Sequence, residues 1–303
     1  MLAHFSILTC STEPTAMPQQ GFNIMVWMLT MNRGYSIAEY DVVYHAVGEC
    51  FPLKDSPEIK YEPMNPDSFR MLATRLLPLL VMFKGSIPRG HWIDQVTKRG
   101  KHWIELVGYL GERTPYDIGY HLSFKNSLCG IAIAQGHTEA VANIGLGIRQ
   151  LKVEPDGISV EEYFSTLHHK LTLFEIDSIL GNPDDVVLKR LNMILTLKEA
   201  YLNAVGSPLS IDSFSRMEFD IPNQRVSGDG NDLPGWEFRI FVASVGVARG
   251  SKIVEEQYEC VCAMFTGASE TRFIFHDTSK SLSQWVQFGN LDNLFSVIPQ
   301  FYS

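Results

Sequence analysis

The residues whose types and spacing are best suited to chemistry lie between positions 84 and 102. Five cations occur there against a single acid, Asp94, in a chain whose formal net charge is −9. Aromatic side chains, including Trp92 and Trp103, are interleaved with these cations. Lysine and arginine bind phosphates and indole rings stack on bases, the two contacts that sequence-tolerant binding of a single nucleic-acid strand requires. The alternative is a solvated basic loop whose tryptophans pack into the core.

Cations elsewhere in the chain could extend this basic surface. Two of them precede a turn near the middle of the sequence, and an adjacent pair follows in the second half. If these side chains gathered in one groove between two lobes, that groove would attract a polynucleotide despite the acidic total charge. The predicted nucleic-acid-binding residues are Lys84, Arg89, Trp92, Lys98, Arg99, Lys101, Arg149, Lys152, Lys189 and Arg190.

Two cysteines and two histidines are weak candidates for a metal site. Cys260 and Cys262 would share one face of a strand, but zinc needs four ligands and the sequence has no second pair. His168 and His169 are adjacent, and adjacent side chains point about 100° apart on a helix, so they cannot both face one ion. The sequence therefore predicts no metal site.

Known catalytic motifs are missing from the sequence. Gly145-Leu146-Gly147 is a lone GxG without the third glycine of a dinucleotide site, and there is neither a P-loop nor a GxSxG serine motif. We therefore expect a protein that is not an enzyme and uses no cofactor. The alternative is an enzyme whose site is assembled from scattered residues, with residues 222–235 as a mobile lid.

The elements that must position these residues are predicted to be mostly helices. A capping box of Ser36 and Glu39 opens a helix through position 47, and a second box, Ser159 with Glu162, opens a long helix to position 181. A helix over residues 183–206 would follow after a short turn, giving an antiparallel hairpin. Apolar spacing predicts further helices over residues 22–31, 67–85, 114–128 and 132–151.

The last part of the chain has a different pattern. Apolar residues alternate over residues 238–242 and 258–262, and residues 272–276 are also strand-like. Periodicity alone cannot separate such strands from buried helices. The predicted fold class is mainly α with two helical lobes, or α+β if these segments give the C-terminal lobe a small β element. Turn-forming residues from 222 to 235 predict a flexible loop.

Turn-forming residues also divide the chain. Pro14, Pro18 and Gly21 interrupt the pattern near the start, so residues 1–21 are predicted to be an N-terminal arm. Residues 154–157 combine a turn signature with a change in composition. The N-terminal helical lobe would then span residues 22–156, and the C-terminal lobe would span residues 157–303.

The bulk composition bears on location and assembly. Five cysteines, an odd number spread over the whole length, indicate reduced thiols and an intracellular location, cytoplasmic or nuclear. Only 19% of the residues are charged, so part of the surface is expected to be covered by copies of the chain or by a partner. No apolar run is long enough to span a membrane, which argues against a membrane partner.

The segment from position 76 to position 151 resembles a known family. Its sequence of features is an apolar helix ending in Gly85, then Ile87-Pro88-Arg89, Val96-Thr97, Arg99-Gly100, and a helix of small residues. This order is similar to that in nucleoproteins of negative-strand RNA viruses, especially those of the bornavirus type, and it covers about a quarter of the chain. The resemblance implies a helical, two-lobed viral protein that encloses single-stranded RNA and polymerises through exchanged terminal arms.

Together, these observations predict an RNA-binding, self-assembling nucleoprotein. Its basic, aromatic groove would coat single-stranded RNA, and the protein would be part of the virion if the viral resemblance holds. An assembly, capsid or scaffold protein that forms a homo-oligomer without binding RNA is the alternative. The unrecognised enzyme is the third hypothesis.

Overall fold

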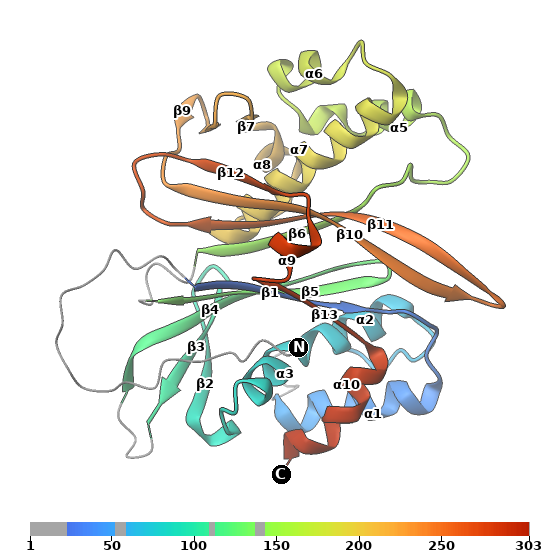
Figure 1. Cartoon of the computed structure of the whole chain (residues 1–303), viewed down its shortest axis with the longest axis vertical. Coiled ribbons are helices and arrows are strands. Elements are labelled where there is room, and N and C mark those ends of the chain that lie inside the picture. Colours follow the sequence, from blue (N-terminus) through green and yellow to red (C-terminus); the bar gives the residue numbers. More distant parts are fainter. Residues whose placement is uncertain (1–22, 52–58, 109–112, 137–142, 303) are drawn as a thin grey trace.

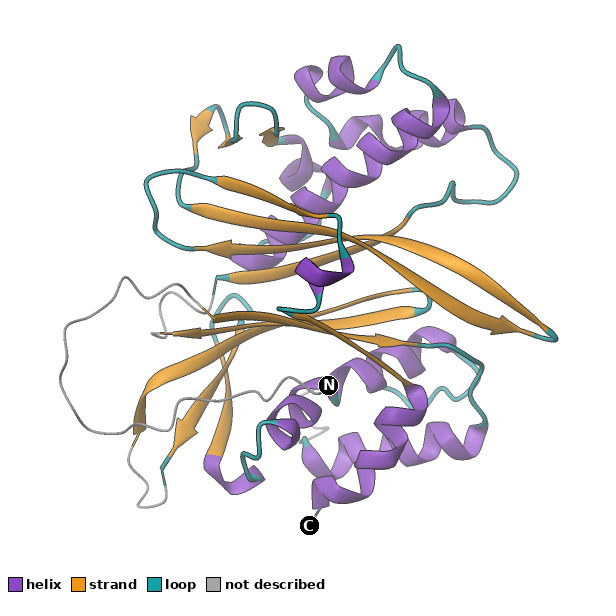
Figure 2. Ribbon diagram, viewed as in Figure 1, coloured by secondary structure: helices purple, strands orange, loops and turns teal. Residues whose placement is uncertain are grey.

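Two β-sheets stacked face to face form the middle of the molecule, and helices cover the outer face of each sheet (Figure 1). The computed structural model describes residues 23–51, 59–108, 113–136 and 143–302. The succession of layers is therefore helices, sheet, sheet, helices, as the colouring by secondary structure in Figure 2 makes plain. No helix of the described residues is both long and apolar enough to cross a membrane.

The first sheet has six strands in the order β13-β1-β5-β4-β3-β2. β1 pairs with β13 in parallel, and the other neighbours are antiparallel. Four helices cover its outer face (Figure 1). The strands are β1 (Asn23–Thr30), β2 (Trp92–Val96), β3 (His102–Val107), β4 (Arg113–Lys125), β5 (Leu128–Gly136) and β13 (Val286–Asn290), and the helices are α1 (Ile37–Cys50), α2 (Pro66–Arg75), α3 (Leu77–Lys84) and α10 (Leu291–Val297).

The second sheet has four strands in the order β12-β10-β11-β6, in which β10 and β12 are parallel. The longest helix, α7, lies over its outer face, with three shorter helices around it (Figure 1). The strands are β6 (Ile144–Gln150), β10 (Trp236–Arg249), β11 (Lys252–Phe265) and β12 (Arg272–His276), and the helices are α5 (Val160–Leu167), α6 (Leu173–Ile179), α7 (Asp184–Val205) and α8 (Ile211–Ser215).

The interior between the two sheets is apolar. Val26 and Met28 of β1 face Leu146 and Ile148 of β6 across it, together with Tyr258 of β11. Cys260 and Cys262 lie in the same layer as buried, free thiols. The inward positions of β11 recur at every second residue, as the period of a strand requires.

The prediction of a mainly helical fold is wrong, since helix and strand take nearly equal shares, 37% and 35%. Within residues 22–31, predicted as a helix, Asn23–Thr30 form β1. This strand is buried on both faces, and such a strand has a continuous apolar run that periodicity cannot distinguish from a buried helix. Residues 114–128 form most of β4, and a spacing of four residues also keeps one face of a strand. Residues 132–151 contribute to β5 and β6.

Several local predictions are confirmed. Both capping boxes form, at Ser36 with Glu39 and at Ser159 with Glu162. α7 spans Asp184–Val205 and ends at a glycine in the left-handed conformation, and the three C-terminal segments are strands. The helix predicted from Ser159 onward is interrupted instead, because a 3₁₀ turn at His168–Lys170 separates α5 from α6.

Two other predictions concern chain organisation. The segment predicted as a flexible loop over residues 222–235 contains β8 (Arg225–Gly228) and β9 (Asn231–Asp232), which complete a small sheet with β7 (Met217–Asp220). The N-terminal arm, residues 1–21, lies outside the described residues. The division into lobes at residue 156 stays a prediction.

Candidate active site

Helix α7 sits directly on strand β6. A Cβ atom added to Gly147 would lie 2.6 Å from the carbonyl oxygen of Thr196, so only glycine allows this approach. Asn203 of α7 donates a hydrogen bond of 3.0 Å to the carbonyl oxygen of Leu146. Side chains that point into the seam between α7, β6 and β11 are therefore held by a close and rigid contact.

Three charged residues meet in this seam. Arg149, two positions beyond Gly147 on β6, pairs in register with Glu259 of β11. Glu199 reaches the same place from α7, and its Oε2 lies 3.6 Å from Nη2 of Arg149. Cross-strand partners in an antiparallel pair have adjacent side chains. One guanidinium therefore lies close to the carboxylate of Glu199 and opposite Glu259 in the strand register, and we call Arg149, Glu199 and Glu259 the charged seam.

The charged seam contains polar atoms without partners. Glu259 is only 1% exposed, and its Oε2 accepts no hydrogen bond within the described part of the chain. The Nε of Arg149 is also buried without an acceptor among the described residues. Buried polar groups in folded proteins are nearly always hydrogen-bonded to protein, water or ligand. The seam thus contains one buried donor and one buried acceptor that have no partner among the described residues.

Burial changes the protonation of the two acids. It raises the pKa of Glu259 to about 7, against the opposing charge of Lys189. It also raises the pKa of Glu199, although Arg149 opposes the shift. About a sixth of the Glu199 side chain is exposed, so this carboxylate is the more accessible of the two. An acid with a raised pKa near neutrality suits proton transfer.

A second cation stands beside the charged seam. Burial lowers the pKa of Lys170, and the nearby charge of Arg149 lowers it further, while Glu199 opposes both effects. The Lys170 ammonium lies 5.2 Å from the centre of the Phe214 ring. Arg149 and Lys170 therefore both act on Glu199, and two neighbouring cations are suited to binding a phosphate group.

Lys198, the residue next to Glu199, stabilises this region through buried contacts. Lys198 and Glu175 form a fully buried ion pair of 2.6 Å. The ammonium of Lys198 also donates to the carbonyl oxygens of Lys170 (2.9 Å) and Phe214 (3.0 Å), while Glu175 accepts the backbone N–H of Phe219 at 3.0 Å. These bonds tie the turn that carries Lys170 to α7, so Lys198 and Glu175 position the site without facing it.

The end of β4, in the first sheet, closes one side of this region. The ammonium of Lys125 lies 3.0 Å from Oε2 of Glu154. Asn126 donates hydrogen bonds to Gln150 at 2.6 Å and to Glu154 at 3.2 Å. Gln150 follows Arg149 directly, so these contacts join the two sheets beside the charged seam.

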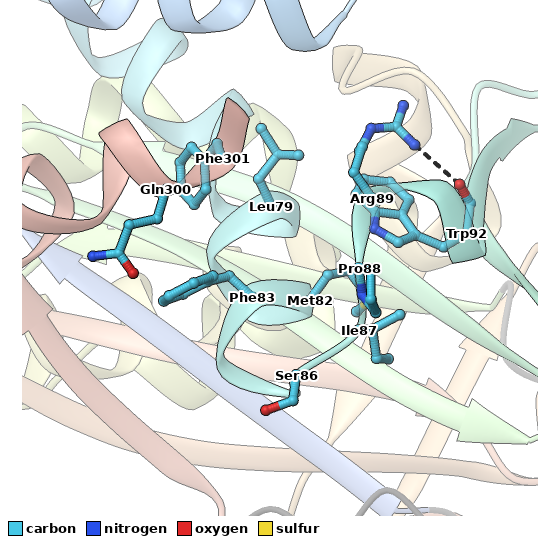
Figure 3. A pocket seen from close by; sticks show the side chains of 10 residues that line it. All are labelled: Leu79, Met82, Phe83, Ser86, Ile87, Pro88, Arg89, Trp92, Gln300 and Phe301. Carbon is cyan, nitrogen blue, oxygen red and sulfur yellow. Dashed lines mark hydrogen bonds between the residues drawn. The ribbon is translucent and has the colours of Figure 1, made fainter. Parts of the chain in front are cut away.

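Three of the residues predicted to bind nucleic acid lie at the outer helical layer of the first sheet. Lys84 ends α3, and Trp92 is 2% exposed. The guanidinium carbon of Arg89 lies 4.1 Å from the centre of the Trp92 ring, and its Nη1 donates to the Trp92 carbonyl oxygen at 3.0 Å (Figure 3). Both groups border a cavity of about 360 Å³ that is lined mainly by apolar side chains such as Phe83 and Phe301.

Three more of the residues predicted to bind nucleic acid lie in or beside the turn between β2 and β3. Lys98 and Arg99 are exposed, and the Arg99 carbonyl is close to Gly206, just past the end of α7. Lys101 is turned inward, 5% exposed, and donates to the carbonyl oxygens of Ile144 and of Asn203, the latter at 2.7 Å. Burial lowers the pKa of Lys101 to about 7.

The remaining four residues predicted to bind nucleic acid lie around α7 and β6. Arg149 belongs to the charged seam and Lys189 acts on Glu259, whereas Lys152 pairs with Asp156 at 2.6 Å. Arg190 donates to a backbone carbonyl of α6. Of these four, Arg149 and Lys189 thus each act on an acid of the charged seam. The β2–β3 turn meets α7 seven residues beyond Glu199, about 10 Å along the helix, and Trp92 lies in another layer.

Whether the charged seam could hold a metal ion can be tested on its donors. Mg²⁺ is bound by oxygen ligands, often one or two carboxylates together with substrate phosphates. Glu199 and Glu259 supply two carboxylates, but the guanidinium of Arg149 lies 3.6 Å from the first, and Arg149 is the register partner of the second. Within the described residues, no group of three or more His, Cys, Asp and Glu side chains is arranged to hold a metal ion. The residues of the seam therefore do not fit a divalent cation.

Comparison with known proteins identifies the family. No family model matches the chain. It is 30% identical over 217 residues to the 4'-phosphopantetheinyl transferase pptA of Paxillus involutus, and the match covers 69% of this chain and 76% of that protein. The chain belongs to the 4'-phosphopantetheinyl transferase family. Its place in a family of transferases overturns the prediction that it is not an enzyme.

The resemblance to viral nucleoproteins was wrong, because it rested on short groups of common residues that the long match to a transferase outweighs. The predicted RNA-binding, self-assembling nucleoprotein is withdrawn with it, as are the capsid or scaffold alternative and single-stranded RNA as the partner. Assembly through terminal arms, which the same resemblance implied, falls too. The burial of Trp92 also removes one of the indole rings that base stacking would have used.

Sequence reasoning overlooked Glu199, Glu259 and Lys170. One signal was available, because Lys198-Glu199 places two charges inside the otherwise apolar helical stretch of residues 194–202. Charges within a buried stretch are rarely tolerated unless they are paired or functional. No local pattern reveals Glu259, whose neighbours are brought to it by the pairing of β11 with β6.

Proposed function

We propose that this protein transfers a 4'-phosphopantetheinyl group from coenzyme A to a hydroxyl group of a carrier protein, and that the charged seam with Lys170 is the active site. The similarity over most of the chain to a 4'-phosphopantetheinyl transferase carries this proposal. The seam supports it, because two acids with raised pKa values lie beside two cations.

The transfer is a displacement at phosphorus. The hydroxyl oxygen of the carrier protein attacks the phosphorus that bears pantetheine in the pyrophosphate of coenzyme A. The bond from that phosphorus to the bridging oxygen breaks, and adenosine 3',5'-bisphosphate leaves with the bond's electron pair. The hydroxyl proton passes to a base. Catalysis of such reactions consists mainly of positioning and of stabilising charge on the phosphate oxygens.

The residues of the seam divide these tasks. Arg149 and Lys170 bind oxygens of the pyrophosphate, and their charge stabilises the negative charge that builds up on the leaving phosphate. Glu199 accepts the hydroxyl proton, because it is the more exposed carboxylate and burial raises its pKa. Glu259, the buried register partner of Arg149, positions the guanidinium.

The test is a transfer assay with coenzyme A and an unmodified carrier protein, followed by intact mass spectrometry of the carrier. We expect the carrier to gain one phosphopantetheinyl group. Glu199→Gln keeps the shape of the side chain but cannot take the proton, so its kcat should fall by roughly 100-fold or more while coenzyme A still binds. A carrier that stays unmodified with the wild-type protein, for both acyl and peptidyl carriers, would contradict the proposal.

A further inference from the structure

Phosphoryl-type transfer from a pyrophosphate commonly uses Mg²⁺, which bridges carboxylates of the protein and oxygens of the substrate. In the charged seam a guanidinium lies beside one carboxylate and opposite the other in the strand register. We propose that Arg149 supplies the positive charge that a divalent cation would otherwise provide, so that this protein binds the pyrophosphate of coenzyme A without a metal ion. This inference rests on the proposed function, since it takes coenzyme A as the ligand.

Arg149 is placed where it adjoins both acids. It lies 3.6 Å from Glu199 and directly opposite Glu259 in the strand register. A divalent cation held by these carboxylates would lie next to the guanidinium. Like charges at that distance repel strongly where burial lowers the effective dielectric constant. A metal ion and Arg149 therefore compete for the same pair of acids.

Strand β6 cannot supply a further carboxylate to the charged seam. The position on the same strand face as Arg149 and nearest to it toward the N-terminus is Gly147, which has no side chain. A Cβ atom there would lie 2.6 Å from the carbonyl oxygen of Thr196, a backbone atom that cannot move unless α7 moves. β6 therefore adds no acid to the seam, and Glu154, a further acid near Arg149, is already paired with Lys125 and Asn126.

Arg149 can form a further hydrogen bond. Its Nη2 group lies toward Glu199, while its Nε–H is buried without an acceptor in the described part of the chain. A guanidinium presents its donors in a planar fork that matches two oxygens of a phosphate. A pyrophosphate oxygen would satisfy the Nε–H donor, which is costly to leave buried and unpaired.

The charges around Glu199 do not cancel. Lys125 and Glu154 neutralise each other as an ion pair, which leaves the cations Arg149 and Lys170 against at most one negative charge on Glu199. Because Glu259 is partly protonated near pH 7, the group has positive charge left over for a phosphate. A surplus of fixed positive charge is what an anion-binding site needs when no ion accompanies the substrate.

The experiment is a calorimetric titration of the full-length protein with coenzyme A, once in excess Mg²⁺ and once in EDTA. We expect Kd values within about threefold of each other. Arg149→Gln should weaken binding roughly 10- to 100-fold in both buffers, as expected when hydrogen bonds to a charged group are lost. Lys152→Gln is the matched control: it removes an exposed cation three residues away, and its Kd should match that of the wild type.

A second variant tests the opposite exchange, in which a carboxylate takes the place of the Arg149 guanidinium. Arg149→Glu would place three carboxylates in the seam, and we expect it to bind Mn²⁺, measured by the loss of the free-ion electron paramagnetic resonance signal. The wild-type protein without coenzyme A should leave that signal unchanged. Coenzyme A binding that disappears in EDTA, or Mn²⁺ binding by the wild-type protein, overturns the inference. The buffer comparison uses only the wild-type chain, so misfolding of a variant cannot obscure it.

The same samples separate this inference from the proposed function. Transfer to a carrier protein together with Mg²⁺-dependent binding of coenzyme A would refute the role of Arg149 and leave the proposed function standing. Metal-free binding of coenzyme A without any transfer would refute the proposed function and support the role of Arg149 in binding. Failure to bind coenzyme A in either buffer refutes both.

Discussion

Replacing Glu259 by glutamine should change the pH dependence of stability in a predictable way. Burial raises the pKa of Glu259 from 4.5 to about 7 in the folded protein. An acid whose pKa is higher in the folded state contributes stability below its unfolded pKa, and this contribution is lost as the pH rises through its folded pKa. The contribution of Glu259 to the free energy of unfolding of the wild type should therefore fall between about pH 4.5 and pH 7.

The magnitude follows from the size of the shift. Each pKa unit corresponds to about 1.4 kcal/mol, so a shift from 4.5 to about 7 corresponds to about 3 kcal/mol. The Glu259 residue is 1% exposed, so solvent does little to reduce this value. Glutamine has nearly the same shape and no charge. The free energy of unfolding of Glu259→Gln, relative to the wild type, should therefore rise by up to about 3 kcal/mol between pH 5 and pH 8.5.

Urea unfolding at a series of pH values measures this difference. Glu256, on the same strand, is a control of opposite sign. Burial raises its pKa, but hydrogen bonds from Tyr258 and Arg249 outweigh that effect and lower it overall. Glu256→Gln should therefore destabilise the protein, by more at pH 7 than at low pH. If the difference in free energy of unfolding between Glu259→Gln and the wild type is the same at every pH, the reasoning about Glu259 is refuted.

Two further predictions concern the contacts that hold the site in place. Gly147→Ala should lower the free energy of unfolding by about 1–3 kcal/mol, because its Cβ collides with α7, whereas Gly90→Ala, which meets nothing within 4 Å, should not. Equal unfolding midpoints for the two alanine variants would argue against the close approach. Lys198→Met should cost about 3–5 kcal/mol, measured by urea unfolding, because it leaves Glu175 buried without its partner. A loss below about 1 kcal/mol would mean that the pair does not stabilise the fold.

The parts of the fold that could be predicted from the sequence are those that depend on local contacts. The capping box of Ser36 with Glu39 and the left-handed glycine at the end of α7 involve residues within one turn of each other. The strands of the first sheet could not be predicted in this way. Val26 faces the layer between the sheets while Leu29 faces the helices, so β1 is apolar on both sides and has no alternation to detect.

The site was harder to predict than the fold. Arg149 is a predicted phosphate-binding cation, but Glu199 and Glu259 are far from it along the chain, so no local pattern pairs them with it. Lys101 shows the opposite difficulty. It belongs to a basic run and was expected at the surface, yet its ammonium is buried against two backbone carbonyls. Side-chain direction depends on tertiary contacts that a count of charges does not contain.

The parallel pairing of β1 with β13 has a consequence for synthesis of the protein. β1 emerges from the ribosome near the beginning, whereas its neighbour begins at residue 286. At about 5–20 residues per second, roughly tens of seconds separate the two strands. During this interval one edge of an apolar strand lacks its partner, and open edges of this kind readily pair with other chains. Nascent chains that pause before residue 286 should therefore need protection by chaperones.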